Sequence, residues 1–239
     1  LSLNVLKANN HILIMQRFII LLVLLCFSAQ ISAQYKNEKV RFTVMSDAHL
    51  GWLYSENSDH KSGALRFGGS GELHIDYFFR PQSALSLGVL MNGTGGNMQY
   101  NEAYVMAFQS GLDTLAPGTT ITYKLRYVEI PFGLKLCTRE IGYMTYYIDT
   151  GINFMFLTQP LASTSDEEYL NVRIDKEVSR FNLAYHLDIG TYYSLGNRTA
   201  LVFSISYKNT FLDLTSDYLS KPPENTRLNH VAIKVGFAF

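Results

Sequence analysis

The sequence predicts an all-β fold, an eight-stranded antiparallel up-and-down transmembrane β-barrel. Three observations favour it. Apolar residues recur with period two along eight segments, and the connections between these segments alternate strictly between short and long. The last segment, 230–239, also keeps its alternation to the final residue, Phe239. Because chain ends usually fray, this strand needs a partner along its whole length, which closure of a barrel provides.

Composition narrows the class of protein. Of 239 residues, 47% are apolar and 17% are charged, whereas about 25% charged residues are usual in soluble domains. The formal net charge is zero, so no basic surface indicates a nucleic acid partner. Aromatic residues are abundant, with 16 Tyr and 15 Phe, as expected at membrane interfaces.

The front of the sequence predicts targeting rather than structure. Residues 1–14 precede the first methionine, and we interpret them as a non-native upstream extension. Residues 15–33 are predicted to be a signal peptide. Its apolar run is shorter than the roughly 20 residues of a membrane-spanning helix, and the small Ala33 precedes the expected cut. The barrel domain is then 34–239, with Cys137 as its one cysteine and therefore no internal disulfide.

The first half of this domain contains four alternating segments. In each one, large apolar residues hold one parity and small or charged residues hold the other, the pattern of a strand with two unlike faces. In the fourth, the residues from Ile121 to Leu125 run in the opposite phase to those from Val128 onward, so we expect a β-bulge near Arg126. The segments, with examples of their apolar parity, are 40–54 (Val44, Leu50), 67–79 (Leu73, Ile75), 83–92 (Leu87, Val89) and 121–136 (Ile130, Phe132).

The second half repeats the pattern four times. No helical period of any length interrupts it. Eight strands in all are therefore expected. These segments are 142–157 (Ile148, Ile152), 180–193 (Leu187, Ile189), 199–211 (Phe203, Ile205) and 230–239 (Val231, Ile233).

The connections predict how the strands are joined. A meander with alternating short and long connections places every tight turn at one end and every long loop at the other. Outer-membrane barrels have this layout, with short periplasmic turns and longer extracellular loops. The short connections are 80–82, 137–141 and 194–197, and the long ones are 55–66, 93–120, 158–179 and 212–229.

Period two alone also fits a soluble, lipocalin-like barrel, which remains the alternative fold. Three features favour the membrane. The strands reach the roughly 9 to 11 residues needed to cross a bilayer, large aromatics lie near strand ends on the apolar parity, and the other parity carries small and charged residues. The expected interfacial aromatics are Trp52, Tyr54, Phe78, Phe79, Tyr143, Phe156, Tyr192, Tyr193, Phe211 and Phe239.

The polar parity predicts a structural network of ion pairs in the lumen. Eight strands enclose only enough space for side chains, so opposite charges there should pair. We expect Glu129 to pair with Arg180 or Lys135, and Pro131 to be tolerated on the lumenal side beside the bulge. A gating or transport role for this network is the alternative. Its predicted members are Glu72, Asp76, Glu129, Lys135, Asp149, Arg180, Asp188, Lys208 and Lys234.

Groupings that carry chemistry are few. His74 with Asp76, and His186 with Asp188, are pairs two residues apart on the inward parity; we interpret them as interior hydrogen-bonding groups rather than metal ligands. No nucleophile and base occur in a catalytic pattern, and no phosphate-binding loop is present, so no cofactor or metal is expected. The acidic run 165–168 is read as a solvated loop tip; the alternative is a divalent cation that bridges lipopolysaccharide.

One stretch resembles a known family. The sequence "YVEIPFGLKL" (127–136) resembles the mid-barrel strand of the PorT-type outer-membrane β-barrel family, and the layout of 34–239, including the final "VGFAF", is similar throughout. The resemblance implies the outer membrane of a Gram-negative-type cell. It also implies that Phe237 and Phe239 form an assembly signal that the barrel-assembly machinery recognises.

These observations together predict a monomeric outer-membrane protein that is not an enzyme and has a structural, scaffolding or binding role in the cell envelope. The expected partners are outer-membrane lipid, lipopolysaccharide, the barrel-assembly machinery, and envelope or secretion-complex proteins. Two alternatives stay open: a narrow or gated porin-like transporter, and an envelope enzyme that modifies lipid.

Overall fold

The computed structural model describes residues 39–55, 60–166, 168–196, 198–216 and 225–239. The chain divides into residues 1–38 and 39–239, and the second unit contains every described residue. The predicted upstream extension and signal peptide lie outside the described residues. Within the described ranges, no helix has the length and hydrophobicity needed to cross a membrane.

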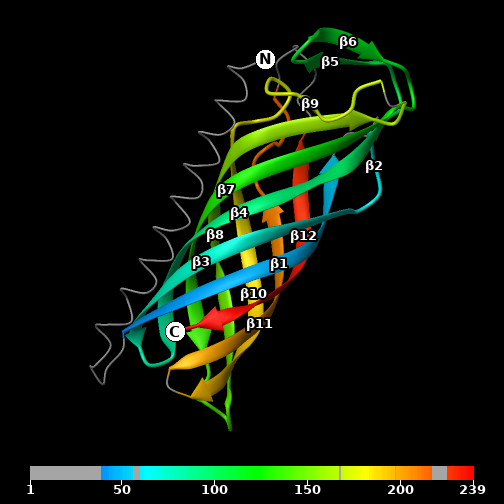
Figure 1. Cartoon of the computed structure of the whole chain (residues 1–239). Helices are drawn as coiled ribbons and strands as arrows, with labels where there is room; N and C mark the ends of the chain where they lie inside the picture. The colour runs from blue at the N-terminus through cyan, green and yellow to red at the C-terminus, as the bar shows by residue number, and fades with distance from the viewer. Residues whose placement is uncertain (1–38, 56–59, 167, 197, 217–224) are drawn as a thin grey trace, which may run out of the picture. The chain divides into compact units, whose positions relative to one another are not determined.

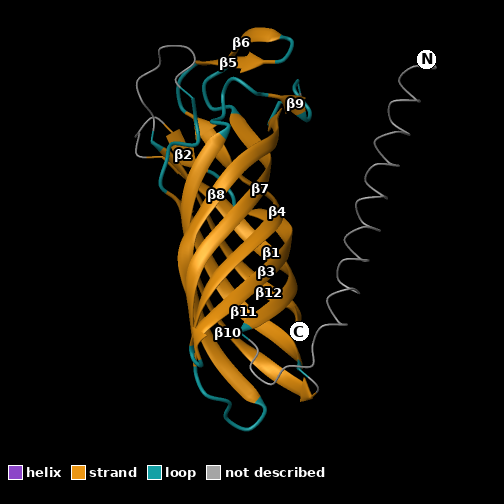
Figure 2. Ribbon diagram, turned by 90° about the vertical axis from the view of Figure 1, so that its left-hand side faces the viewer, coloured by secondary structure: helices purple, strands orange, loops and turns teal. Residues whose placement is uncertain are grey.

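Eight long antiparallel strands form a closed barrel, as predicted (Figure 1). Neighbouring strands around the barrel are β1, β3, β4, β7, β8, β10, β11 and β12, and β12 pairs with β1 to close it. The strands are tilted against the barrel axis (Figure 2), as closure requires. Their bounds are β1 Val40–Ser55, β3 Arg66–Arg80, β4 Ser83–Tyr100, β7 Thr120–Cys137, β8 Met144–Thr164, β10 Phe181–Gly196, β11 Thr199–Thr210 and β12 Thr226–Ala238.

Four short strands decorate the end with the long loops. β2 (His60–Ser62) pairs with β4, and β9 (Val172–Arg173) pairs with β8. β5 (Tyr104–Phe108) and β6 (Gly111–Leu115) form a separate two-stranded hairpin at this end (Figure 1). The tight turns lie at the opposite end, so the predicted alternation of short and long connections is confirmed.

The closing seam runs along the whole of the last strand. β12 and β1 pair from Thr43 opposite Ala238 to Ser55 opposite Thr226. Beyond them, Phe239 N–H donates to the carbonyl of Phe42 at 2.8 Å and Phe42 N–H donates to the carbonyl of Phe239 at 3.0 Å. The alternation of 230–239 therefore continues to its final residue because that residue still belongs to the seam.

The outer wall is apolar, as predicted for lipid contact. Phe132, Phe203 and Val235 remain 46–49% exposed although they lie within long, regular strands. The interior parity of the same strands holds buried polar and charged residues such as Glu129 and Lys234. A soluble barrel would have the reverse arrangement, with its apolar residues inside.

A bulge is present near Arg126, as predicted, but the strand whose inward and outward alternation shifts there is β8 rather than β7. The register between β7 and β8 shifts at Arg126 and Tyr127. The extra residue is Thr158 of β8, whose hydroxyl donates to the carbonyl of Arg126 at 2.9 Å. β7 itself keeps one parity throughout, so Ile121, which we expected on the lipid side, points inward and is fully buried together with Tyr123 and Leu125.

Two of the predicted interfacial aromatics also face inward. Tyr192 is buried, and Phe78 is half-buried beneath the guanidinium of Arg41, 5.0 Å from its ring centre. Arg41 also lies 4.6 Å from the ring centre of Tyr192. Both aromatic residues therefore help to fill the lumen near the tight turns rather than contacting the membrane interface.

The cost of placing a charge on the outer wall should depend on where the residue lies along the barrel axis. Replacing Ile205, which is 63% exposed at the middle of β11, with Arg should lower the free energy of unfolding by ~2–4 kcal/mol, because the charge would enter hydrocarbon. Urea unfolding of the barrel in phospholipid vesicles measures this cost. Tyr143→Arg, at the tight-turn end, is the matched control and should cost only ~0–1 kcal/mol. Equal costs at the two positions would contradict a location of Ile205 near the middle of the bilayer and of Tyr143 near its surface.

Candidate functional site

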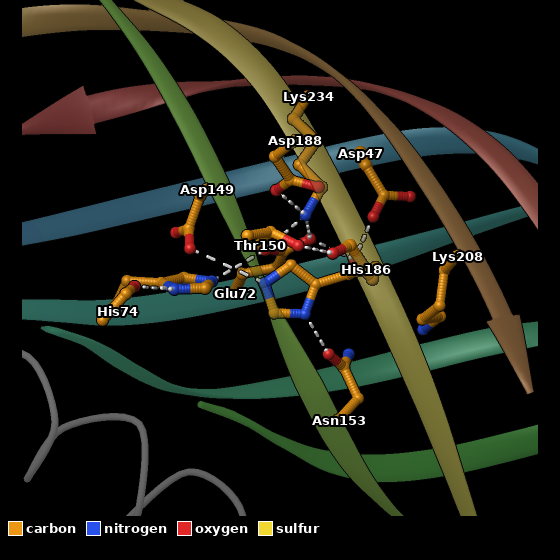
Figure 3. A network of polar contacts seen from close by, with 12 residues as sticks. Asp47, Glu72, His74, Asp149, Thr150, Asn153, His186, Asp188, Lys208 and Lys234 are labelled. Carbon is orange, nitrogen blue, oxygen red and sulfur yellow. Dashed lines mark hydrogen bonds and ion pairs between the residues drawn. The ribbon is translucent and has the colours of Figure 1, made fainter. Parts of the chain in front are cut away.

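The lumen contains a buried network of charged side chains (Figure 3). Eight of the nine residues predicted for it are buried there, and Asp76 and Glu129 are completely inaccessible. Arg180 is the exception and corrects the prediction: it is exposed and immediately precedes β10, which begins at Phe181. Its position in the alternating pattern suggested the lumen, but the strand starts one residue later.

Glu129 is the centre of the layer nearest the long loops. Lys208 Nζ lies 2.7 Å from both of its carboxylate oxygens, and this lysine, rather than Arg180 or Lys135, is its cation. Asn92 Nδ2 donates to one oxygen at 2.6 Å and Asn153 Nδ2 to the other at 2.7 Å. These three partners replace the water molecules that the carboxylate loses when it is buried.

Lys234 forms the middle layer. Its ammonium group lies 2.9 Å from Asp188 Oδ2 and 3.1 Å from Glu72, so one cation joins two carboxylates from different strands (Figure 3). His74 Nε2 is 2.9 Å from Glu72, and the hydroxyl oxygen of Ser70 lies 3.1 Å from the same carboxylate. The layer connects β12, β10 and β3 across the barrel.

Lys135 forms the layer nearest the tight turns. It lies 2.8 Å from both oxygens of Asp76 and 3.3 Å from Asp149. The hydroxyl of Tyr192 donates to Asp76 at 3.4 Å, and the ring of Tyr147 lies 5.3 Å from the lysine nitrogen. His186 joins this layer to the loop-side layer, since it contacts Asp149 at 3.7 Å and Asn153 at 2.6 Å.

Several network members were missed by the sequence prediction. Asp47 contacts the ring of His49 at 2.7 Å and accepts a hydrogen bond from Ser70. His49 in turn stacks on His230, with ring centres 4.5 Å apart. Asp47 and His49 occupy the inward parity of an imperfectly alternating strand, and that parity was the signal that could have placed them in the network.

The network has little room for a ligand. A cavity of about 20 Å³ lies among its side chains, which is space for about one water molecule. Among the described residues, no cluster of three or more His, Cys, Asp or Glu side chains is placed to hold a metal ion. The site is therefore suited to packing and neutralising charge rather than to holding a substrate.

One serine has neighbours that resemble a nucleophile's surroundings. Ser86 Oγ lies 3.5 Å from His74 Nδ1, and the other nitrogen of that ring contacts Glu72. Nucleophilic catalysis needs such a base and orienting acid, but also access for the reacting bond. Ser86 is buried and does not line the cavity, so we assign this arrangement a structural role.

Apolar side chains close the lumen at both ends of the network. Toward the tight turns, Met45, Tyr147, Tyr192, Val202 and Ala238 form a small cluster. Toward the long loops a larger cluster combines strand and loop residues. Its members include Leu53, Met98, Tyr100, Tyr123, Leu125, Tyr127, Met155 and Leu228 from the barrel, and Tyr104, Met106, Phe108, Leu115, Ile174, Val178 and Leu214 from the loop end.

Polar contacts hold the loop residues over this cluster. The buried carboxylate of Glu177 accepts from Ala107 N–H at 2.7 Å and from the hydroxyl of Tyr104 at 3.2 Å, which binds β5 to the segment after β9. Tyr169 stacks on Phe108 with ring centres 3.9 Å apart. We call this assembly of β5, β6 and residues 169–178 the loop cap.

A second contact of the loop cap affects two pKa values. The hydroxyl of Tyr169 donates to Asp113 Oδ2 at 2.6 Å. This hydrogen bond, with a smaller contribution from Thr114 N–H, lowers the pKa of Asp113, and the same contact raises the pKa of Tyr169 to about 12. The ionised carboxylate and the neutral phenol are thus the forms that hold the hairpin.

A closed barrel with an apolar outer wall and a polar interior is characteristic of outer-membrane β-barrel proteins. The comparison with family models supports this class and adds the family: residues 28–216 match the model described as outer membrane protein beta-barrel domain. The chain belongs to that family, and its place is the outer membrane. No curated protein matches the chain.

Several solved structures of outer-membrane proteins have a similar course of the chain. A major outer membrane protein from Thermus thermophilus is 14% identical, with a TM-score of 0.45 over 84% of this chain and 100% of that chain. Ail of Yersinia pestis is 12% identical, with a TM-score of 0.44 over 84% and 100%. OprG of Pseudomonas aeruginosa is 12% identical, with a TM-score of 0.41 over 84% and 96%. Similarity at this level is too low to transfer any function.

The burial of Glu129 predicts a large cost for removing its cation. Lys208→Met should lower the free energy of unfolding by ~3–5 kcal/mol, because it leaves a carboxylate charged and unpaired in the interior. Adding Glu129→Gln should recover part of this loss, since the amide oxygen can still accept from Asn92 or Asn153. Urea unfolding measures the free energy of unfolding of the unmodified barrel, of Lys208→Met and of the double variant. Arg173→Met is the control, because its ion pair with Asp175 is exposed and should contribute only ~0–1 kcal/mol; similar losses for Lys208→Met and Arg173→Met would contradict the role of burial.

Removing the Tyr169 hydroxyl should change the pKa of Asp113 in the loop cap. Tyr169→Phe removes the main hydrogen bond that stabilises the carboxylate, so the pKa of Asp113 should rise toward its ordinary value of 3.8. Because a lowered carboxyl pKa stabilises the folded form above the ordinary pKa, this contribution is lost as pH falls through the folded-state value. NMR titration of the Asp113 carboxyl carbon measures the shift, with Asp175 as internal control. An unchanged Asp113 titration would contradict the contact.

Proposed function

We propose that this protein is a closed, non-enzymatic outer-membrane barrel with a structural, scaffolding or binding role that it exercises through its exposed ends. The observation that carries the proposal is the filled lumen. Three layers of buried ion pairs are enclosed between two apolar clusters, and the cavity among them measures only about 20 Å³. A barrel with no room inside must act through its surfaces.

A gated transporter is the alternative that this observation weighs against. Opening a path would require displacement of the loop cap and separation of Lys208, Lys234 and Lys135 from their carboxylates. Each separation would leave a buried charge without its partner, at a cost of several kcal/mol. An enzyme that modifies lipid is disfavoured for a related reason, because Ser86, His74 and Glu72 have no open approach.

We further propose that the barrel is of the PorT type and is associated with envelope or secretion-complex proteins. The residues that carry the resemblance lie on β7, where Glu129 anchors the loop-side layer and Pro131 faces the lumen two residues away. The proposed monomer needs no second chain to complete its sheet, since β12 already pairs with β1. Lipopolysaccharide is the proposed lipid partner on the loop side.

The proposed assembly signal lies on the outer wall. Phe237 and Phe239 are 48% and 47% exposed, so both rings are accessible to the assembly machinery before the seam meets lipid. Their backbone groups also complete the pairing with β1. The exposed rings and the paired backbone together support a role in insertion as well as in closure.

The filled lumen predicts electrical silence. The purified barrel, inserted in planar bilayers, should show no current above the bilayer background, because ions find no continuous aqueous path. A variant without residues 101–118, which removes the whole β5–β6 hairpin of the loop cap, should also stay silent, since the three ion-pair layers remain. An open porin measured in the same bilayers is the positive control. A steady current from the unmodified barrel would contradict the proposal and favour the transporter.

A further inference from the structure

The tight-turn end of the barrel presents a set of exposed cations. Lys39 precedes β1, Arg80 ends β3, Arg139 lies in the turn between β7 and β8, and Arg198 lies in the turn between β10 and β11. All four residues are exposed. Because each comes from a different position around the barrel, the charge is spread along the rim; we call these four residues the basic rim.

Acidic residues are scarce at this end. Among the described residues there, Glu140 has the one exposed acidic side chain, while the other side-chain carboxylates near this end, such as Asp76 and Asp149, are buried and engaged by Lys135. The loop end differs, because cations and acids are mixed there. Its described acids include Glu102, Asp113, Asp166, Glu168, Asp175 and Asp213, and its cations include Lys61, Lys124, Arg126, Arg173, Lys176, Arg180 and Arg227.

Exposed aromatic residues fix the depth of the basic rim. Phe79 is adjacent to Arg80 and 50% exposed. Tyr143 and Tyr193, which are 69% and 41% exposed, lie near the other two turns with ring centres 6.3 Å apart. Aromatic side chains of this kind settle at the boundary between hydrocarbon and headgroups. Cations a few residues beyond them therefore lie at the level of the lipid phosphates.

Two members of the basic rim lie at the ends of neighbouring strands, Lys39 directly before β1 and Arg80 at the end of β3. Phe78 N–H donates to the carbonyl of Lys39 at 2.6 Å, which places Lys39 beside the end of β3, two residues from Arg80. The backbone therefore places two cations on one short stretch of the rim. Arg80 adds a planar fork of donors, a geometry that matches phosphate oxygens.

We propose that the basic rim binds the phosphate groups of anionic phospholipids in the periplasmic leaflet of the outer membrane. The inference depends on charge complementarity and on the depth of the aromatic residues, and it is independent of the function proposed above. Attraction between juxtamembrane cations and anionic headgroups is strong within a Debye length and weakens as salt screens it. The rim would thus select lipid on the side of the membrane that faces the tight turns.

Native mass spectrometry of the purified full-length barrel tests the proposal directly. The barrel is released from mixed micelles that contain equal amounts of phosphatidylglycerol and phosphatidylcholine, and the retained lipids are counted. The unmodified barrel should retain phosphatidylglycerol preferentially. The triple variant Arg80→Gln, Arg139→Gln and Arg198→Gln should lose most of this preference, since three of the four cations are lost.

A matched variant separates a local site from general charge. Lys61→Gln, Arg126→Gln and Arg180→Gln also removes three exposed cations, but from the loop end, and should leave the preference nearly unchanged. Equal reductions in the two variants would overturn the proposal, because they would show a nonspecific effect of net charge. So would the absence of any preference in the unmodified barrel, which would leave an acidic periplasmic protein as the better candidate for this surface.

A second measurement keeps the proposal testable if the rim variant does not fold. Heat-modifiable migration on a detergent gel reports whether each variant is a closed barrel. On the unmodified barrel alone, the preference for phosphatidylglycerol should fall as sodium chloride is raised from about 0.05 M to about 0.5 M, because the Debye length shrinks several-fold over this range. A preference that is insensitive to salt would overturn the electrostatic assignment.

Discussion

Closure of the backbone hydrogen-bond ladder between β12 and β1 is the constraint on which the rest of this structure depends. Hydrocarbon offers no partner for an N–H or C=O group, so a sheet edge within the membrane would leave a row of unpaired groups at several kcal/mol each. The seam from Thr43 opposite Ala238 to Ser55 opposite Thr226, extended by the two hydrogen bonds between Phe42 and Phe239, leaves no such edge. Only because the sheet is closed does the inward parity become an interior, where charged residues can meet one another instead of lipid.

Closure with eight strands in turn makes the lumen narrow, and the narrowness explains the mixture of small and charged residues on the inward parity. A side chain at Gly133 would place its Cβ 2.8 Å from Asp149 Oδ1 and 3.2 Å from His186 Nε2. A side chain at Gly88 would place its Cβ about as close to the ring of His74, at 3.0 Å. The glycines therefore provide the volume that the ion pairs occupy. The side chains of Asp149, His186 and His74 occupy space that a side chain at Gly133 or Gly88 would fill.

The sequence predicted the parts of this structure that depend on local pattern. Period two identified the eight strands, the alternation of connection lengths ordered them, and the outward position of Phe203 and Val235 followed from parity. Partners within the lumen were not predictable, because Glu129 meets Lys208 across the barrel and nothing in the local sequence of β7 encodes that distance. Ile121, Tyr123 and Leu125 were misassigned for a different reason. Apolar residues can occupy the inward parity of a membrane barrel where loops cover the end of the lumen. The sequence of β7 does not show that its first residues lie beneath such loops. Arg180 was misplaced because parity has meaning only inside a strand.

The layers of the lumen also determine how rigidly the two ends of the barrel are held. Ion pairs in the middle are compensated by one another, and apolar clusters lie above and below them. Such an interior confers rigidity, since a shift of one strand would break contacts in several layers at once. Rigidity in the wall holds the two ends at fixed depth and orientation relative to the bilayer. The loop end, with the hairpin held by Glu177 and Tyr169, presents a mixed-charge surface outward, whereas the tight turns present a predominantly basic one. The two ends are therefore chemically distinct surfaces on one stiff support, and a partner that recognises one of them would find little to bind at the other.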